Sequence, residues 1–429
     1  MADLVKKYGQ IVDSLIERHP VAARRMLLFG YYAKRIQLKK FPLKGLSPAR
    51  NMMALTSMDA VINPLRHPEN AALVSIFTPC EFLQAAGIYP MLAEAMASYI
   101  NGTKAESGFL DQAQQHGLPQ TFCSYHRVLL GAILSDVIPK PKFIFHTSLA
   151  CDANSLTFRR AEEHWKIPRF FLDIPYDDGE DSVRYVEEQL REFPGFLEKE
   201  TGIRIEERLL KERVASAGRT MRALENSQKL KVGKYLSNDL TDEMYEVFAN
   251  HVLLGTDEVE RFAVQLEEDM KKAEPSKGIR LLWMHVIPYY QDDLRAMMNF
   301  SDRCQIISCD MNYDEYCVMD PEKPYESIAR RLVQDAFNGP VSNRIDRTLE
   351  MCRMLDVDGV VYFCHWGCKQ TLASSQVVRK GLEDAGFPTL ILDGDGCDAS
   401  NMSNGQILTR MEAFLEMLEA GKEGGSKHA

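Results

Sequence analysis

Three cysteines stand in three separate apolar segments that could bring sulfur ligands to one place. They are Cys123 in TFCSYHRVLLG, Cys151 in SLACDANSLTFRR and Cys368 in VVYFCHWGCKQT. Cys151 and Cys368 fall where an apolar run gives way to polar residues, and in an open α/β sheet ligands gather at the carboxyl ends of strands. Three thiolates from separate loops can hold a metal centre and leave one position free for another ligand. The combination favours an iron–sulfur enzyme.

A fourth cysteine and a carboxylate follow an earlier apolar run, in IFTPCEFLQAAGIYP. A Pro-Cys-Glu turn that enters a helix places Cys80 and Glu81 at the helix N-terminus, where backbone N–H groups favour a thiolate or a carboxylate. An ordinary helix start, in which the glutamate complements the helix dipole, explains the same residues and is favoured for this turn alone.

The last cysteine segment is the densest in reactive side chains, because Cys364 and Cys368 flank His365 and Gly367. Gly367 permits a tight turn, and Lys369 together with helix N–H groups would lower the pKa of Cys368. Cys364 lies within the apolar run and is expected to pack there. Taken singly, a cysteine such as Cys123 is more often a small buried residue than a ligand, so the argument rests on the joint occurrence of these segments.

Other common site motifs are absent from the sequence. It has no Cys-x-x-Cys pair for a zinc ribbon, no G-x-G-x-x-G fingerprint, no phosphate-binding loop and no G-x-S-x-G element. The Asp- and Gly-rich stretch LILDGDGCD (390–398) lacks the spacing of a calcium loop. We expect it to be a turn at the end of a strand that can also line the cleft.

Composition describes an ordinary globular protein of 429 residues with 45% hydrophobic residues, enough for two or three domains. A net charge of −10 gives no support for nucleic acid or an anionic membrane as a partner. No apolar run approaches the ~20 residues of a membrane span, and the N-terminus reads as an amphipathic helix rather than a signal peptide. A cytoplasmic location is therefore expected, where the ten cysteines would be thiols or metal ligands.

The order of apolar and helical segments predicts an α/β fold with two Rossmann-like parallel-sheet domains. A helical N-terminal segment (1–50) precedes the first Rossmann-like domain (51–180), a helical connector (181–272) follows, and the second Rossmann-like domain occupies 273–429. The strand candidates are short apolar or β-branched runs at 71–79, 142–150, 169–175, 279–288, 303–311, 357–367 and 387–395. Between the first two runs, EFLQAAGIYPMLAEAMASYI is expected to be helical.

Several of these segments together resemble the 2-hydroxyacyl-CoA dehydratase and benzoyl-CoA reductase family, of the 2-hydroxyglutaryl-CoA dehydratase D-component type. The matching set is PCEFLQAAGIYP, FCSYHR, ACDANS, VDGVVYFCHWGCKQT, AGFPTLILDGD and GQILTRMEAFLEML, which spans about residues 70–418. The resemblance implies that Cys123, Cys151 and Cys368 hold one [4Fe-4S] cluster. The chain departs from the family at Cys80, where related chains carry a carboxylate, so the fourth iron is left to water, substrate, Glu81 or Cys80.

The resemblance also implies a reaction, in which a 2-hydroxyacyl-CoA loses water to give a 2-enoyl-CoA. One electron added to the thioester carbonyl gives a ketyl that expels the 2-hydroxyl group and acidifies the β-hydrogen, which no ordinary side-chain base could remove. Glu81 and His365 are the side chains expected to take part, and Lys369 is a candidate for the phosphates of CoA. The implied partners are an ATP-hydrolysing iron–sulfur activator and either a related second subunit or a second copy of this chain.

Four alternatives remain open at this level. The same cluster could reduce a benzoyl-CoA-like acyl-CoA, or the chain could be a subunit that only relays electrons. A double-cubane reductase is disfavoured because the paired cysteines of that branch are missing, although Cys304, Cys309 and Cys317 keep it open. A metal-free scaffold would contain no iron.

Overall fold

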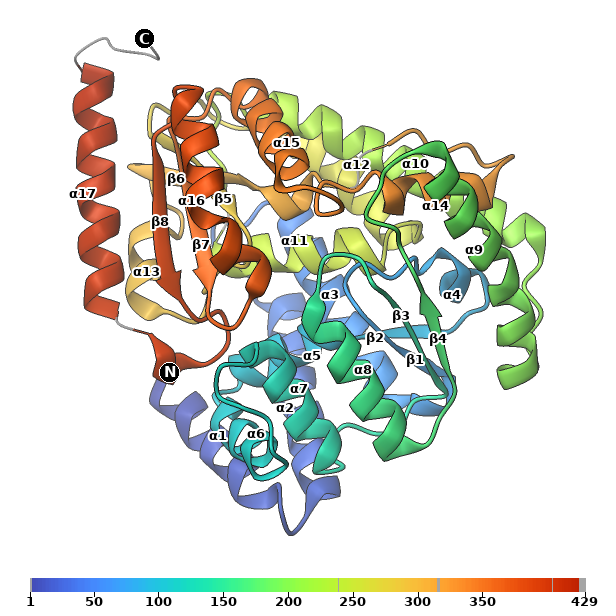
Figure 1. Ribbon diagram of the computed structural model, residues 1–429. Helices are drawn as coiled ribbons and strands as arrows, with labels where there is room; N and C mark the ends of the chain where they lie inside the picture. The colour runs from blue at the N-terminus through green and yellow to red at the C-terminus, as the bar shows by residue number, and fades with distance from the viewer. Residues whose placement is uncertain (1, 238, 315–316, 403, 424–429) are drawn as a thin grey trace.

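The computed structural model describes residues 2–237, 239–314, 317–402 and 404–423. Two four-stranded sheets lie side by side with helices around them (Figure 1). Every strand pair in the described part of these sheets is parallel. The predicted α/β fold with two parallel sheets is therefore confirmed.

The first sheet has the order β2-β1-β3-β4. Its strands are β1 (Ala71–Val74), β2 (Tyr89–Leu92), β3 (Phe143–Thr147) and β4 (Arg169–Leu172). All residues of β1 and β3 are buried, as expected of central strands covered on both faces.

The second sheet repeats this order as β6-β5-β7-β8. Its strands are β5 (Ile279–Met284), β6 (Cys304–Cys309), β7 (Gly359–His365) and β8 (Thr389–Gly394). In both sheets the second strand along the chain (β2 or β6) pairs with one side of the first (β1 or β5), and the third strand (β3 or β7) pairs with the other side. Ligands bind beyond the carboxyl ends of the strands at such a reversal, which here lies between β1 and β3 and between β5 and β7.

The segment 81–100 corrects one expectation, because it is not helical throughout. It forms the short helix α4 (Glu81–Ala85), then strand β2, then α5 (Ala93–Gly102). Gly87 has φ +68°, a left-handed conformation that ends α4 at little cost. Pro90 cannot donate a ladder hydrogen bond, but β2 is an edge strand where that donor is not needed.

Helices α1 (Ala2–Leu15) and α2 (Pro20–Lys40) form the N-terminal segment. Helix α2 packs on α3 (Pro48–Arg66), and α1 packs on α6 (Glu106–Gln115). Two further helices before the connector are α7 (Ser124–Leu134) and α8 (Asp152–Trp165). The predicted helical N-terminus is thus observed, with α3 beginning just before residue 50. The division into domains at residues 50, 180 and 272 stays a prediction.

The connector consists of α9 (Glu180–Thr201), α10 (Glu207–Leu230), α11 (Leu240–Val252) and α12 (Asp257–Lys272). Helices α10 and α12 pack along each other, and α12 and α11 both pack on α3. Buried apolar residues of α12 recur every three or four positions, so one face is covered while charged residues occupy the other. This helical layer links the N-terminal helices to the second sheet.

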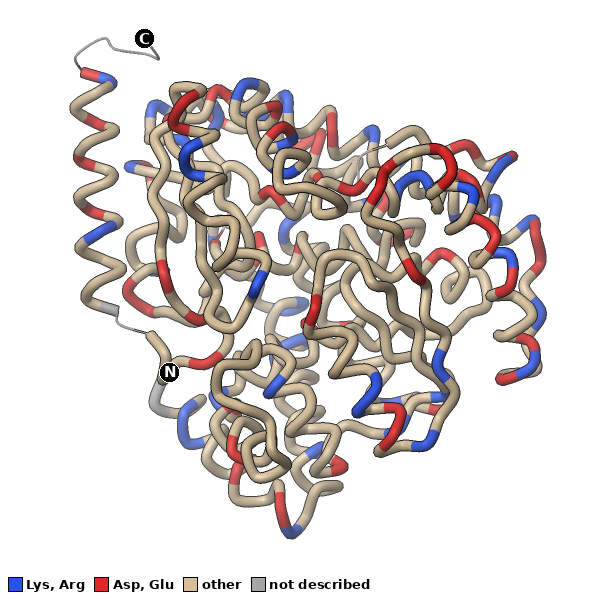
Figure 2. The backbone as a smooth tube through the Cα atoms, in the orientation of Figure 1, with Lys and Arg blue, Asp and Glu red and all other residues tan. Residues whose placement is uncertain are grey.

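The second sheet is covered by α13 (Asp292–Met298), α15 (Val341–Met354), α16 (Lys369–Asp384) and α17 (Asn404–Glu423), whereas α14 (Pro324–Val333) packs on α9 and α10 of the connector. Helix α16 packs on β7 and β8, and α17 lies along the outer side of the sheet (Figure 1). Lysine and arginine alternate with acidic residues over the outer helices (Figure 2). Within the described residues no helix is both long and apolar enough to cross a membrane.

Candidate functional site

Each of the three predicted cysteine ligands occupies the N-cap of a helix. Cys123 precedes α7, Cys151 precedes α8 and Cys368 precedes α16. Helix α8 follows the inner strand β3 of the first sheet and α16 follows the inner strand β7 of the second, so Cys151 and Cys368 lie at the strand reversal of each sheet. The backbone N–H groups of a first helical turn favour negative charge. The positions therefore suit sulfur that is bound as thiolate.

A close backbone approach joins the loops of Cys123 and Cys368. Gly367 has φ +79°, and a Cβ at this position would lie 2.7 Å from the Cys123 nitrogen. Only glycine therefore fits this conformation and this contact. On the other side, the Lys369 ammonium lies 3.7 Å from the carboxylate of Asp152, which follows Cys151. The loops of the three cysteines are thus neighbours. Cys123 and His365, which ends the strand before Cys368, are 242 positions apart in the sequence.

The pKa values of the cysteine thiols also indicate that the three cysteines lie close to one another. Burial raises the pKa of the Cys123 thiol well above its ordinary value, and Cys151 and Cys368 raise that pKa further. Burial also raises the pKa of Cys151, with additional contributions from Glu94 and Cys368. Three thiolates in one region of low dielectric repel one another unless a cation accompanies them. Burial therefore keeps Cys123 and Cys151 as neutral thiols unless a cation, such as a bound metal, compensates the charge of the thiolates.

The donor set consists of cysteine sulfurs, which are the usual ligands of iron–sulfur clusters. Among the described residues, no three histidine, cysteine or acidic side chains form a group that could hold one metal ion. A single zinc would need sulfurs at about 2.3 Å from one centre, whereas a [4Fe-4S] cluster spreads its thiolates over different irons. No two cysteines form a disulfide in this part of the chain. The sulfur donors therefore remain available as ligands.

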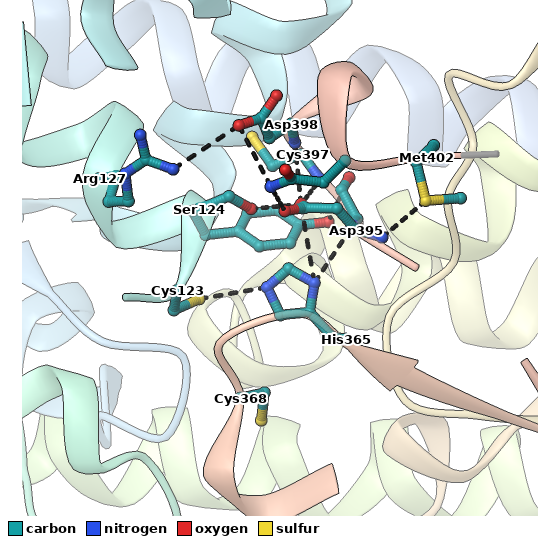
Figure 3. A network of polar contacts seen from close by, with 12 residues as sticks. Cys123, Ser124, Arg127, His365, Cys368, Asp395, Cys397, Asp398 and Met402 are labelled. Carbon is teal, nitrogen blue, oxygen red and sulfur yellow. Dashed lines mark hydrogen bonds and ion pairs between the residues drawn. The ribbon is translucent and has the colours of Figure 1, made fainter. Parts of the chain in front are cut away.

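Two imidazoles contact the sulfurs. Nε2 of His365 lies 3.3 Å from Cys123 Sγ (Figure 3), and Nε2 of His126 lies 3.4 Å from Cys151 Sγ. Burial lowers the pKa of both rings, that of His126 to about 3. Both rings are therefore neutral at physiological pH. His365 was predicted to take part in catalysis, and the structure places it against a predicted ligand.

The turn after β8 connects the two halves of the site. Ser124 Oγ donates a 2.5 Å hydrogen bond to Asp395 Oδ1, and the Tyr125 hydroxyl donates to the Gly396 carbonyl at 3.1 Å. Arg127 and Asp398 form an ion pair at 3.6 Å (Figure 3). The stretch 390–398, expected to be a turn at a strand end, is the last part of β8 followed by a turn at 395–398, and this turn holds α7 beside the second sheet.

A buried cation near Cys368 was missed by sequence reasoning. Arg344 on α15 donates two hydrogen bonds to Asp310 Oδ2, at 2.9 and 2.6 Å, and its positive charge is close enough to interact with Cys368. The other oxygen of Asp310 accepts the backbone N–H of His285, which has φ +74°. Arg344 Nη1 is buried without a hydrogen-bond partner among the described residues. Nothing in the α15 sequence distinguishes this arginine from its exposed neighbours.

A buried carboxylate near Cys151 was also missed. Glu94 lies in the first turn of α5, burial raises its pKa to about 7, and its charge raises the pKa of Cys151. Its Oε2 atom is buried and makes no hydrogen bond within the described structure. A single acidic residue in the apolar run MLAEAMASYI was the only available signal.

The Pro-Cys-Glu turn lies where the sequence placed it, at the start of α4. Cys80 is the N-cap residue and is 1% exposed. Glu81 is also buried, and both of its oxygens accept hydrogen bonds from the Arg331 guanidinium. The negative charge of the Glu81 carboxylate is therefore balanced by the buried guanidinium of Arg331. The predicted roles of Glu81 in catalysis and of Cys80 as a fourth ligand stay predictions.

Comparison with known proteins gives consistent matches. The family model described as 2-hydroxyglutaryl-CoA dehydratase, D-component, matches residues 75–418. The lactoyl-CoA dehydratase subunit alpha of Anaerotignum propionicum is 23% identical, over 80% of this chain and 89% of the relative. The (R)-phenyllactyl-CoA dehydratase alpha subunit of Clostridium sporogenes is 22% identical, over 80% and 88%. The alpha subunit of (R)-2-hydroxyglutaryl-CoA dehydratase from Acidaminococcus fermentans is 24% identical, over 68% and 63%.

Proposed function

The chain belongs to the 2-hydroxyglutaryl-CoA dehydratase D-component family, and on that premise we propose that it is the iron–sulfur subunit of a 2-hydroxyacyl-CoA dehydratase. The observation that carries the proposal is the convergence of Cys123, Cys151 and Cys368 at three helix N-termini. The expected reaction is the elimination of water from a 2-hydroxyacyl-CoA to give a 2-enoyl-CoA.

In this proposal the three cysteines hold a [4Fe-4S] cluster. When bound, the cluster supplies one low-potential electron and a Lewis-acidic iron that is not held by these cysteines. The chain itself supplies burial on the side of Cys123 and neutral imidazole beside two of the sulfurs. Glu94 is the nearest candidate for moving a proton, because its carboxyl group is buried, lies near Cys151 and has a pKa raised to about 7.

Two partners follow from the same premise. The similar proteins are named alpha subunits, which supports a related second subunit or a second copy of this chain. The electron would come from an ATP-hydrolysing iron–sulfur activator, because the sequence has no phosphate-binding loop of its own. Lys369 follows Cys368, is highly exposed and pairs with Asp152. From this position its ammonium can also bind the phosphates of CoA.

Reduction of an acyl-CoA by the same cluster is the second candidate, because it would need the same three cysteines. The double-cubane alternative has less support. Cys304 and Cys309 stand at opposite ends of β6, about 16 Å apart at the usual rise of a strand. One cubane cannot be held by both.

The cluster assignment is tested by iron and sulfide analysis of anaerobically purified protein. Wild-type protein should carry about four irons per chain, and Cys123→Ala, Cys151→Ala and Cys368→Ala should each lose most of them. Cys352→Ala is the matched control, since Cys352 is a buried cysteine of α15 in the core of the second sheet. Full iron in two of the three ligand variants would contradict the assignment.

The reaction is tested with 2-hydroxyacyl-CoA, the partner subunit and the activator, with and without ATP. Enoyl-CoA formed only with ATP and reductant supports the radical elimination. A reduced acyl-CoA as product would favour the reductase. Enoyl-CoA formation at the same rate without ATP and reductant would contradict the radical reaction and favour ordinary acid–base elimination.

A further inference from the structure

The ring of His365 has a defined orientation and tautomer. The backbone N–H of Gly396 donates to Nδ1 at 3.0 Å. A backbone N–H can only donate, so Nδ1 must carry a lone pair. In the neutral ring the hydrogen is then on Nε2, the atom that lies 3.3 Å from Cys123 Sγ (Figure 3).

Asp395 does not compete for the imidazole. Its nearest oxygen is 3.8 Å from Nδ1, beyond hydrogen-bond range. That oxygen, Oδ1, already accepts from Ser124 Oγ at 2.5 Å and from the backbone N–H groups of Cys397 and Asp398 at 2.9 and 2.8 Å. The carboxylate therefore holds the turn that presents the Gly396 N–H, and it does not act as a proton acceptor for His365.

The ring is fixed by its packing as well. His365 is 1% exposed, and Tyr125 contacts it edge to face at a centroid separation of 5.3 Å. The Tyr125 hydroxyl is itself bonded to the Gly396 carbonyl. The same short turn thus orients the imidazole through Gly396 and its neighbour through Tyr125.

We propose that His365 is a positioning residue that donates its Nε2–H to the sulfur of Cys123 and so raises the reduction potential of the cluster bound there. The inference rests on the proposed function only in requiring a cluster at Cys123. An N–H directed at a cluster sulfur stabilises the additional negative charge of the reduced state. In this role His365 exchanges no proton with the substrate, which differs from the catalytic role expected from the sequence.

His126 provides an internal comparison. Its Nε2 lies at a similar distance from Cys151, but its Nδ1 has no hydrogen-bond partner among the described residues. Nothing there fixes which nitrogen carries the hydrogen. The donor role is therefore assigned to His365 alone.

Two substitutions of His365 test the roles of its two ring nitrogens separately. His365→Gln places an amide near Nε2 and can still donate to sulfur, whereas His365→Asn places its amide near Nδ1 and keeps only the contact with Gly396. The assay is a redox titration of the anaerobic protein, followed by electron paramagnetic resonance. His365→Asn should lower the equilibrium constant for one-electron reduction by roughly tenfold, equivalent to about 59 mV, while His365→Gln should stay within a factor of about three.

A second measurement uses the wild-type protein labelled with ¹⁵N-histidine. Pulsed resonance should detect histidine nitrogen coupled to the reduced cluster, and His365→Gln should lose the coupling of His365, leaving only that of His126 beside Cys151, while keeping its iron. An unchanged potential in His365→Asn, or absence of the coupling in wild-type protein, would overturn the proposal. An equal fall in both variants would overturn the donor role and leave a packing role. The iron content of the wild-type protein and the identity of the reaction product report on the proposed function separately.

Discussion

Gly367 offers the sharpest test of how the cysteine loops are held together. A Cβ at this position would meet three backbone atoms, the Cys123 nitrogen at 2.7 Å, the Phe122 carbonyl carbon at 2.8 Å and Cys123 Cα at 2.9 Å. Backbone cannot rotate away as a long side chain can. Gly367→Ala must therefore push the loop of Cys368 away from that of Cys123, or displace both.

Two costs add in this variant. A non-glycine residue at φ +79° costs about 1–2 kcal/mol of free energy, and overpacking typically costs 1–3 kcal/mol more. Gly202→Ala isolates the first cost, because Gly202 ends α9 at φ +77° with no atom within 4 Å of the added Cβ. Gly367→Ala should thus destabilise the fold by about 2–5 kcal/mol, and Gly202→Ala by about 1–2 kcal/mol.

The assay combines denaturant midpoints of the iron-free proteins with iron content of the anaerobic proteins. Gly367→Ala should lose more stability than Gly202→Ala and should lose most of its iron, because displaced sulfurs no longer match the geometry of the cluster. Gly202→Ala should keep its iron. Equal midpoints and full iron in both variants would show that the two loops do not depend on their contact.

Two further predictions concern buried charge. Burial raises the pKa of Glu106 from its ordinary 4.5 to about 7, so the folded state holds this proton more tightly and stability should fall as pH rises from about 4.5 to 7. Glu106→Gln should remove this loss and be more stable at pH 8 by up to about 3 kcal/mol; unchanged pH dependence would refute it. Arg50 bonds Glu243 at 2.8 Å and Glu246 at 2.6 Å in the interior. Arg50→Met should cost about 3–5 kcal/mol in urea unfolding, and a loss below 1 kcal/mol would contradict this.

The strands could be predicted because their apolar runs carry a local signal. The seven predicted runs each contain an observed strand, and every run extends beyond its strand. The run at 71–79 ends as a strand at Val74, because Ser75 and Thr78 bond to each other and Thr78 bonds to the Phe145 carbonyl. This turn depends on the neighbouring strand. Strand β2 was missed because its helix-like surroundings gave no sign of a sheet edge.

The site residues also fall into two groups, those with a signal in their own sequence segment and those without one. Cys123, Cys151 and Cys368 could be proposed as ligands because the family resemblance marks all three and the ends of apolar runs mark Cys151 and Cys368. Asp395, Arg344 and Glu94 could not, since their importance lies in contacts with residues far away in the chain. Ser124 and Asp395, for example, are 271 positions apart. A side chain that is defined by such a contact has no signature in its own segment.

The unequal burial of the three sulfurs bears on how a substrate could reach the site. Cys123 is 8% exposed and is closed in by His365 and by the backbone of Gly367. Cys151 and Cys368 are only partly buried, and the ion pair beside them is exposed. Under the proposed function, packed rings and backbone fill the Cys123 side, so a thioester substrate would approach from the side of Cys151 and Cys368. His365 on the closed side would then tune the potential of the cluster, and the partly exposed side would be left for the reaction.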